Sequence, residues 1–260
     1  MTLAYEIAGP KDAPAVFLAS SLGSDRHMWD EVMSALSAYR VVRVDFPGHG
    51  ESATPSVEGE YTPEQLGEAI LEVADAEGIE KFHMAGLSLG GMMSLWMAIN
   101  RPERLESFMM MCSGPVLLPS QAWRDRAEKS RTEGTQSLVE GTLQRWFTPA
   151  FYEENGPLVQ RTRDTFVSCD DEGYAKCCEV IANMDNREGL GKVSLPMGVV
   201  RAEFDGTLPE ADANELVEAV KAGGNEEVTL YYVEAAAHLA AVEKPAEVAN
   251  ALLEHLRKYA

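Results

Sequence analysis

Short apolar runs and helical patterns alternate along most of this chain of 260 residues, and this alternation restricts the fold more than any other feature. Strand-like runs that are separated by helical segments are typical of βαβ units, in which helices cover a mostly parallel sheet. The predicted strands are 15–20, 40–45, 82–87, 105–112, 195–202 and 228–233. The sequence therefore predicts an α/β fold with a mostly parallel, twisted sheet flanked by helices.

Capping signals bound the predicted helices. Thr62 is a typical N-cap residue and Pro63 suits the first helical position. The apolar residues that follow share one helical face, and Gly78 is a stop signal, so a helix is predicted over 63–77. Similar signals predict helices over 91–100, 209–222 and 245–258.

The interval from about residue 116 to residue 185 has helical patterns and no predicted strand. Stop signals at Gly134, Pro149, Gly156 and Gly173 divide it into several helices. A helical block inserted between two sheet strands is expected to cap the carboxyl edge of the sheet, where open α/β sheets bind ligands. We therefore predict a core of residues 1–115 and 186–260 and a helical cap of residues 116–185. The alternative is a row of ordinary surface helices.

The string Gly86-Leu87-Ser88-Leu89-Gly90 lies between the predicted strand 82–87 and the predicted helix 91–100. In that context a GxSxG string is typical of a nucleophile elbow, which exposes a serine on a sharp strand-to-helix turn. The glycines tolerate the strained backbone and the close approach of the neighbouring chain. A glycine-rich turn selected for packing is the alternative, so the chemistry of Ser88 depends on partners elsewhere in the chain.

A serine hydroxyl becomes a good nucleophile when a base removes its proton, and His238 is the candidate base. It follows the predicted strand 228–233 in a short loop, which places it at the same edge of the sheet as Ser88. Three other histidines, His27, His49 and His83, precede Ser88. His255 lies among charged residues of the last helix, where a solvated side chain is expected.

The carboxylate that orients the base is predicted to be Asp205, in the loop after strand 195–202. Its competitor is Glu203, two residues closer to the strand. Asp205 is preferred because Gly206 behind it lets the loop turn back toward His238. An aspartate before glycine is also a common turn residue without a chemical role, as a histidine in an alanine-rich loop is often structural.

Acyl transfer further requires an oxyanion hole, that is, two N–H groups directed at the charge that develops on the substrate oxygen. The backbone N–H of Leu89, directly after the nucleophile, is one candidate. The backbone N–H of Leu22, in the loop after strand 15–20, is the other. That loop would otherwise be a plain strand-to-helix connection.

The order of these motifs resembles the α/β-hydrolase superfamily, and within it the 3-oxoadipate enol-lactonases of the β-ketoadipate pathway, over nearly the whole chain. The elbow and the run Asp45-Phe46-Pro47-Gly48-His49-Gly50-Glu51-Ser52 are typical of the superfamily in general. Narrower matches are Ser21-Leu22-Gly23 with Met28-Trp29-Asp30, and Arg145-Trp146-Phe147-Thr148-Pro149. The chain departs from the lactonases at Ser20, where they usually have Asn, at Pro47, where they usually have Arg, and in the loop 203–209.

The resemblance implies that Ser88, with His238 and Asp205, opens an enol-lactone through an acyl-enzyme and needs neither a metal nor an organic cofactor. Our hypothesis is that Trp146 and Arg145 close over the ring and receive the free carboxylate of the substrate, with Ser21 as a further substrate-binding residue. The alternative for Trp146 is a core aromatic of the cap. A carboxylesterase, a C–C bond hydrolase or a cofactor-free haloperoxidase with the same triad remains an alternative, as does a ligand-binding receptor of this fold.

The formal net charge of −20 argues against partners that are bound through phosphate groups, such as DNA, RNA or an anionic membrane surface. The acidity is uneven, because residues 116–163 hold 7 Lys+Arg against 6 Asp+Glu. This near-neutral region is where a small anionic lactone, the expected partner, would enter.

The four cysteines have no metal-ligand spacing and are expected to be ordinary small apolar residues, so no metal site is predicted. The chain has no basic and then apolar leader, and no apolar run of the roughly 18 to 20 residues that a membrane span needs. The sequence therefore predicts a cytoplasmic protein.

Overall fold

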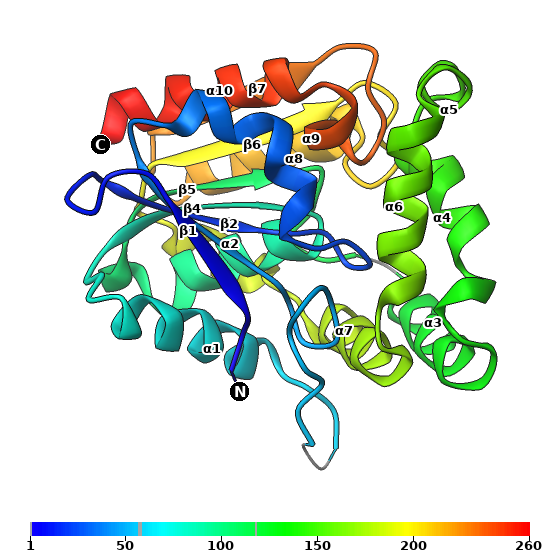
Figure 1. The fold of residues 1–260 in the computed structure, drawn as a ribbon. Helices are drawn as coiled ribbons and strands as arrows, with labels where there is room; N and C mark the ends of the chain where they lie inside the picture. The colour runs from blue at the N-terminus through cyan, green and yellow to red at the C-terminus, as the bar shows by residue number, and fades with distance from the viewer. Residues whose placement is uncertain (1, 57–58, 118) are drawn as a thin grey trace.

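One seven-stranded sheet organises the molecule in the computed structural model, which describes residues 2–56, 59–117 and 119–260. The strand order is β1-β3-β2-β4-β5-β6-β7, and every neighbouring pair is parallel except the antiparallel pair β1 and β3. Figure 1 shows α1 and α2 on one face of the sheet and η1 and α10 on the other. The predicted α/β fold with a mostly parallel sheet is confirmed.

The six predicted strands are all present, with bounds within two residues of the expected ones. They are β2 (Ala15–Ala19), β3 (Arg40–Val44), β4 (Phe82–Leu87), β5 (Leu105–Met111), β6 (Met197–Ala202) and β7 (Val228–Val233). The central strands read as continuous apolar runs because helices cover both faces of the sheet. The strand β1 (Tyr5–Ala8) was not predicted, because this short edge strand has half-buried or exposed residues and therefore a weak apolar signal.

Four helices of the core begin and end within two residues of the predicted bounds: α1 (Pro63–Ala76), α2 (Leu89–Asn100), α8 (Glu210–Ala222) and α10 (Pro245–Tyr259). The core also contains η1 (Arg26–Leu36), η2 (Pro102–Arg104), η4 (Arg187–Lys192) and α9 (Ala240–Glu243). At the start of α1, Thr62 and Gln65 form a reciprocal capping box, with hydrogen bonds of 3.2 and 3.0 Å. The 3-10 helices η1, η2 and η4 and the short α9 were not predicted.

Five α-helices lie between β5 and β6: α3 (Ser120–Glu133), α4 (Val139–Trp146), α5 (Pro149–Glu154), α6 (Gly156–Ser168) and α7 (Asp171–Asn183). A 3-10 turn, η3 (Thr135–Ser137), joins α3 to α4. An isolated antiparallel bridge pairs Val116 with Asp185, so the two ends of this interval meet. Figure 1 shows α3 to α7 gathered at one end of the sheet, opposite the C-terminus. Residues 1, 57 and 58 of the predicted core and residue 118 of the predicted cap lie outside the described residues.

The expectation of a solvated His255 is wrong. The side chain is buried, and its Nε2 lies 3.0 Å from the hydroxyl of Ser107 on β5. Nδ1 of His83 on β4 lies 2.7 Å from the same hydroxyl. The charged neighbours of His255 in the sequence project from other faces of α10, whereas His255 itself faces the sheet.

All four cysteines are free and buried. Within the described residues, no group of three or more His, Cys, Asp or Glu side chains has an arrangement that would hold a metal ion. No helix in the same part of the chain is both long enough and apolar enough to cross a bilayer.

Candidate active site

Ser88 occupies the sharp turn between β4 and α2. Its backbone has φ 58° and ψ −114°, a left-handed conformation that is strained for a residue with a side chain. A Cβ on Gly86 would lie 2.2 Å from the backbone of Gly90, and a Cβ on Gly90 would lie 2.2 Å from the carbonyl oxygen of Ala19. Glycine is therefore required at both positions, because the neighbouring backbone leaves no space for another residue.

His238 lies at the carboxyl end of β7 and pairs with Asp205, which follows β6. Nδ1 of His238 is 2.9 Å from Oδ1 of Asp205, and both side chains are buried. The competitor Glu203 instead accepts a hydrogen bond of 2.8 Å from the backbone N–H of Ala235. Of the two acidic residues, Asp205 is thus the one that the structure brings to the histidine.

The environment of Asp205 keeps its carboxyl group ionised. Burial raises the pKa of Asp205, but the charge of His238 and hydrogen bonds from His238 and Thr207 outweigh that effect, so its pKa lies below the usual value. A carboxylate in this position holds the histidine ring in one orientation and stabilises its protonated form.

Thr207 contributes to this arrangement, although the sequence analysis assigned it no role. Its backbone N–H donates to Oδ1 of Asp205 at 2.9 Å, and its hydroxyl lies 3.1 Å from Nδ1 of His238. The two-residue spacing from Asp205 to Thr207 is that of an Asx turn, which is the signal that could have identified it.

The backbone N–H groups of Leu22 and Leu89 are free to bind a ligand. Neither donates a hydrogen bond to any acceptor in the described part of the chain. Leu89 is the first residue of α2, where a helix leaves its N–H unsatisfied and its dipole favours a negative charge. The next amide, of Gly90, donates to the carbonyl oxygen of Ser20 at 3.2 Å, which ties the Leu22 loop to the elbow.

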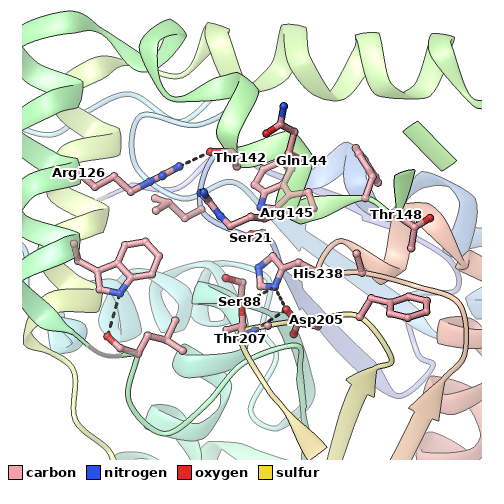
Figure 2. A pocket seen from close by; sticks show the side chains of 18 of the residues that line it. Ser21, Ser88, Arg126, Thr142, Gln144, Arg145, Thr148, Asp205, Thr207 and His238 are labelled. Atoms are coloured by element: carbon pink, nitrogen blue, oxygen red, sulfur yellow. Dashed lines mark hydrogen bonds and ion pairs between the residues drawn. The ribbon is translucent and has the colours of Figure 1, made fainter. Parts of the chain in front are cut away.

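A cavity of about 670 Å³ lies between the sheet edge and the inserted helices. Figure 2 shows Ser88, His238 and Asp205 on one side of it, with Arg126, Thr142 and Arg145 across from them. Of the residues predicted for the site, the cavity is lined by Ser21, Leu22, Ser88, Arg145, Trp146, Asp205 and His238. Leu89 does not line it, since its side chain is fully buried beneath the elbow.

Trp146 belongs both to the cavity wall and to the packing of the inserted helices. It is 4% exposed and contacts Phe166 edge to face, with ring centroids 5.7 Å apart. Trp146 is therefore a core aromatic of the inserted helices that also lines the cavity, and its contact with a substrate stays a prediction.

Arg126 and Arg145 are unusual among the cations of α3 to α7. Within the described residues, every other Lys and Arg of these helices pairs with a carboxylate, as Arg124 does with Glu60. Arg126 is held by neutral groups, the hydroxyls of Tyr174 and Thr142, each at 2.6 Å. Arg145, one turn after Thr142 on α4, has no partner in that part of the chain.

The two guanidinium groups influence each other. The pKa of Arg145 lies below its usual value. Desolvation is the main cause, although the residue as a whole is exposed, and the positive charge of Arg126 is the second cause. Two unneutralised cations on one wall of a cavity favour an anionic ligand. The sequence analysis assigned this role to Arg145 alone, because no pattern in the sequence links Arg126 on α3 to a residue on α4.

Comparisons with known proteins identify the family of the chain. The α/β-hydrolase fold family matches residues 14–245. 3-Oxoadipate enol-lactonase 1 of Acinetobacter baylyi is 34% identical over 94% of this chain and 89% of its own length. Enol-lactonase 2 of the same organism is 31% identical over 100% of this chain and 94% of its own. The crystal structure of the enol-lactonase from Burkholderia xenovorans superposes with a TM-score of 0.91 at 33% identity, covering 98% of this chain and 96% of that one.

Proposed function

The chain belongs to the α/β-hydrolase fold family, and we propose that it is a serine hydrolase that opens 3-oxoadipate enol-lactone to 3-oxoadipate in the β-ketoadipate pathway. Its similarity to enol-lactonases over almost the full chain supports this substrate. The observation that carries the proposal is the shared cavity, where Ser88, the paired His238 and Asp205, and the loop of Leu22 face an unpaired guanidinium group.

In the first half of the proposed reaction, His238 accepts the proton of the Ser88 hydroxyl while Oγ attacks the lactone carbonyl carbon. In the described part of the chain, Ser88 Oγ makes no hydrogen bond to His238, whose Nδ1 pairs with Asp205 and Thr207. The contact between nucleophile and base is often long in a free enzyme and tightens with substrate. The N–H groups of Leu22 and Leu89 bind the oxyanion. The ring C–O bond then breaks, His238 returns the proton to the leaving enolate oxygen, and the enol becomes a ketone while the acyl group stays on Ser88.

In the second half, His238 removes a proton from water, and the resulting hydroxide attacks the acyl carbonyl. The same N–H groups bind the second oxyanion, and His238 gives its proton to Ser88 as the ester bond breaks. An enolate is a good leaving group, so the main contributions of the protein are orientation and oxyanion stabilisation. Arg145 binds the free carboxylate of the substrate, and Trp146 packs against the ring.

The test of the nucleophile is Ser88→Ala. We expect the loss of enol-lactone absorbance in the ultraviolet to slow by roughly 10⁴-fold or more, with an unchanged melting temperature, because the remaining site can only bind the substrate. Retention of most of the activity would exclude the proposed mechanism.

The test of the substrate compares the enol-lactone with a simple p-nitrophenyl ester. A much higher kcat/KM for the lactone would support the lactonase assignment, whereas a preference for the ester would indicate a general carboxylesterase. Repeated turnover on each active site, rather than one stalled adduct, would distinguish an enzyme from a receptor of this fold.

A further inference from the structure

Glu243, the last residue of α9, is a buried carboxylate that contacts two segments of the active site. Its Oε2 accepts a hydrogen bond of 2.9 Å from the backbone N–H of Ala237, next to His238. Its Oε1 accepts from the backbone N–H of Thr148 at 3.1 Å and from the Thr148 hydroxyl. The carboxylate thus joins the loop of the histidine to the wall of the cavity.

Each group that contacts Glu243 is a hydrogen-bond donor. The Thr148 oxygen accepts from the N–H of Phe151 at 3.3 Å, so its own hydrogen is available for Glu243. Within the described residues, no cation forms an ion pair with Glu243, which is 6% exposed. These donors are all satisfied only if both side-chain oxygens of residue 243 accept hydrogen bonds, as the two oxygens of an ionised carboxylate do. A glutamine would direct its NH₂ group at one of them.

A second link connects the same two segments. The backbone N–H of Leu239 donates to the carbonyl oxygen of Trp146 at 2.9 Å. Ala237 and Leu239, the two neighbours of His238, are therefore both bonded to residues 146–148, one through Glu243 and one directly. The position of the histidine depends on the inserted helices as well as on β7.

We propose that Glu243 is a positioning residue that keeps His238 and the cavity wall at residues 146–148 in register for catalysis. This inference rests on the proposed function, since it takes His238 to be the base. Loss of the Glu243 link leaves Asp205 and the Leu239 bond in place, so the histidine is retained in the site but its distance to Ser88 is less well defined. Proton transfer is sensitive to such a displacement.

The test is Glu243→Gln, which preserves the size of the side chain and removes one acceptor. We expect kcat on the lactone, normalised to sites titrated with a serine-reactive phosphonate, to fall roughly tenfold to a hundredfold, with a rise in KM. The matched control is Glu247→Gln, an exposed glutamate one turn later, which should keep both constants. A merely structural role would lower the melting temperature and the number of titrated sites but leave kcat per site unchanged, and that result would overturn the proposal.

Thr148→Val provides a second test, which can still be carried out if the Glu243→Gln variant does not fold. It removes the hydroxyl that donates to Glu243, and we expect a lower kcat besides a higher KM. The double variant should lose no more than Glu243→Gln alone, because both changes act through one link. Additive losses, or an unchanged kcat in Thr148→Val, would contradict the proposal. If Ser88→Ala retained activity, the proposed function itself would fail, whatever Glu243 does.

Discussion

Arg126 and Arg145 show how single residues acquire a role from what surrounds them. The run 145–149 singled out Arg145 in the sequence, but nothing in the order of the residues separates Arg126 from Arg124 or Arg131. In the structure, the latter two pair with Glu60 and with Glu172 and Glu179. Arg126 and Arg145 line the cavity and have no carboxylate partner among the described residues. The missing counter-charge is what points to an acidic ligand.

We predict that Arg126→Ala and Arg145→Ala each raise KM for the anionic lactone roughly tenfold or more, with a smaller effect on kcat, because a charge-assisted hydrogen bond to the carboxylate is lost. The methyl ester of the same lactone should be affected much less. Lys129→Ala is the matched control, since this α3 cation pairs with Glu133 outside the cavity. Equal losses on the acid and on its ester would contradict this role for both arginines.

At the scale of elements, the elbow depends on how closely β4, α2 and β2 approach one another. Gly86 and Gly90 face each other across the turn, and Gly90 also meets the backbone of Ala19. The strain at Ser88 persists because these contacts determine the path of the chain on both sides of it. A turn of this kind is recognisable in the sequence, since the close approach of the backbones requires glycine two residues before and two residues after the serine.

Gly86→Ala should destabilise the protein by about 2 kcal/mol or more, since its Cβ would overlap the backbone of Gly90, which can move only if β4 and α2 separate. The same displacement would move Ser88 and reduce kcat/KM. Gly156→Ala at the start of α6 is the control, because a Cβ at that position would have no other atom within 4 Å. Urea unfolding and lactone turnover of both variants measure the difference. Equal stabilities would mean that the elbow can relax without cost.

At the scale of the whole molecule, buried neutral histidines make stability depend on pH. Burial, together with the charges of His83 and Lys258, lowers the pKa of His255 from 6.5 to about 4. Burial also lowers the pKa of His83, with which His255 shares the Ser107 hydroxyl, and that of His49. Each of these groups takes up a proton more readily in the unfolded chain than in the folded one.

Stability is therefore fully present above pH 6.5 and falls as the pH approaches 4, because the unfolded state binds more protons in that range. His255 alone should account for about 3 kcal/mol of this loss. We expect His255→Gln, whose amide can still reach Ser107, to show a smaller decrease in the free energy of unfolding between pH 7 and pH 4. Urea denaturation at several pH values measures this. An identical decrease in both proteins would mean that other groups cause it.

The sequence was sufficient to predict six of the seven strands, the elbow and the order of the triad candidates along the chain. Those features depend on local patterns: continuous apolar runs for strands buried on both faces, and glycines where a turn has no space for a Cβ. Helix bounds were predictable for the same reason, because caps such as Thr62 act within one turn.

Three outcomes depend on the tertiary structure. It places Asp205 rather than Glu203 beside His238. It also buries the side chain of His255, and it brings Arg126, Thr207 and Glu243 to the site. Each of these outcomes depends on a contact between segments far apart in the chain, or on the face of a helix that meets the sheet. Charge pairing and burial are properties of that packing. Charge pairing and burial cannot be predicted from a local sequence pattern, because the partner of a side chain is determined only when helices and strands pack together.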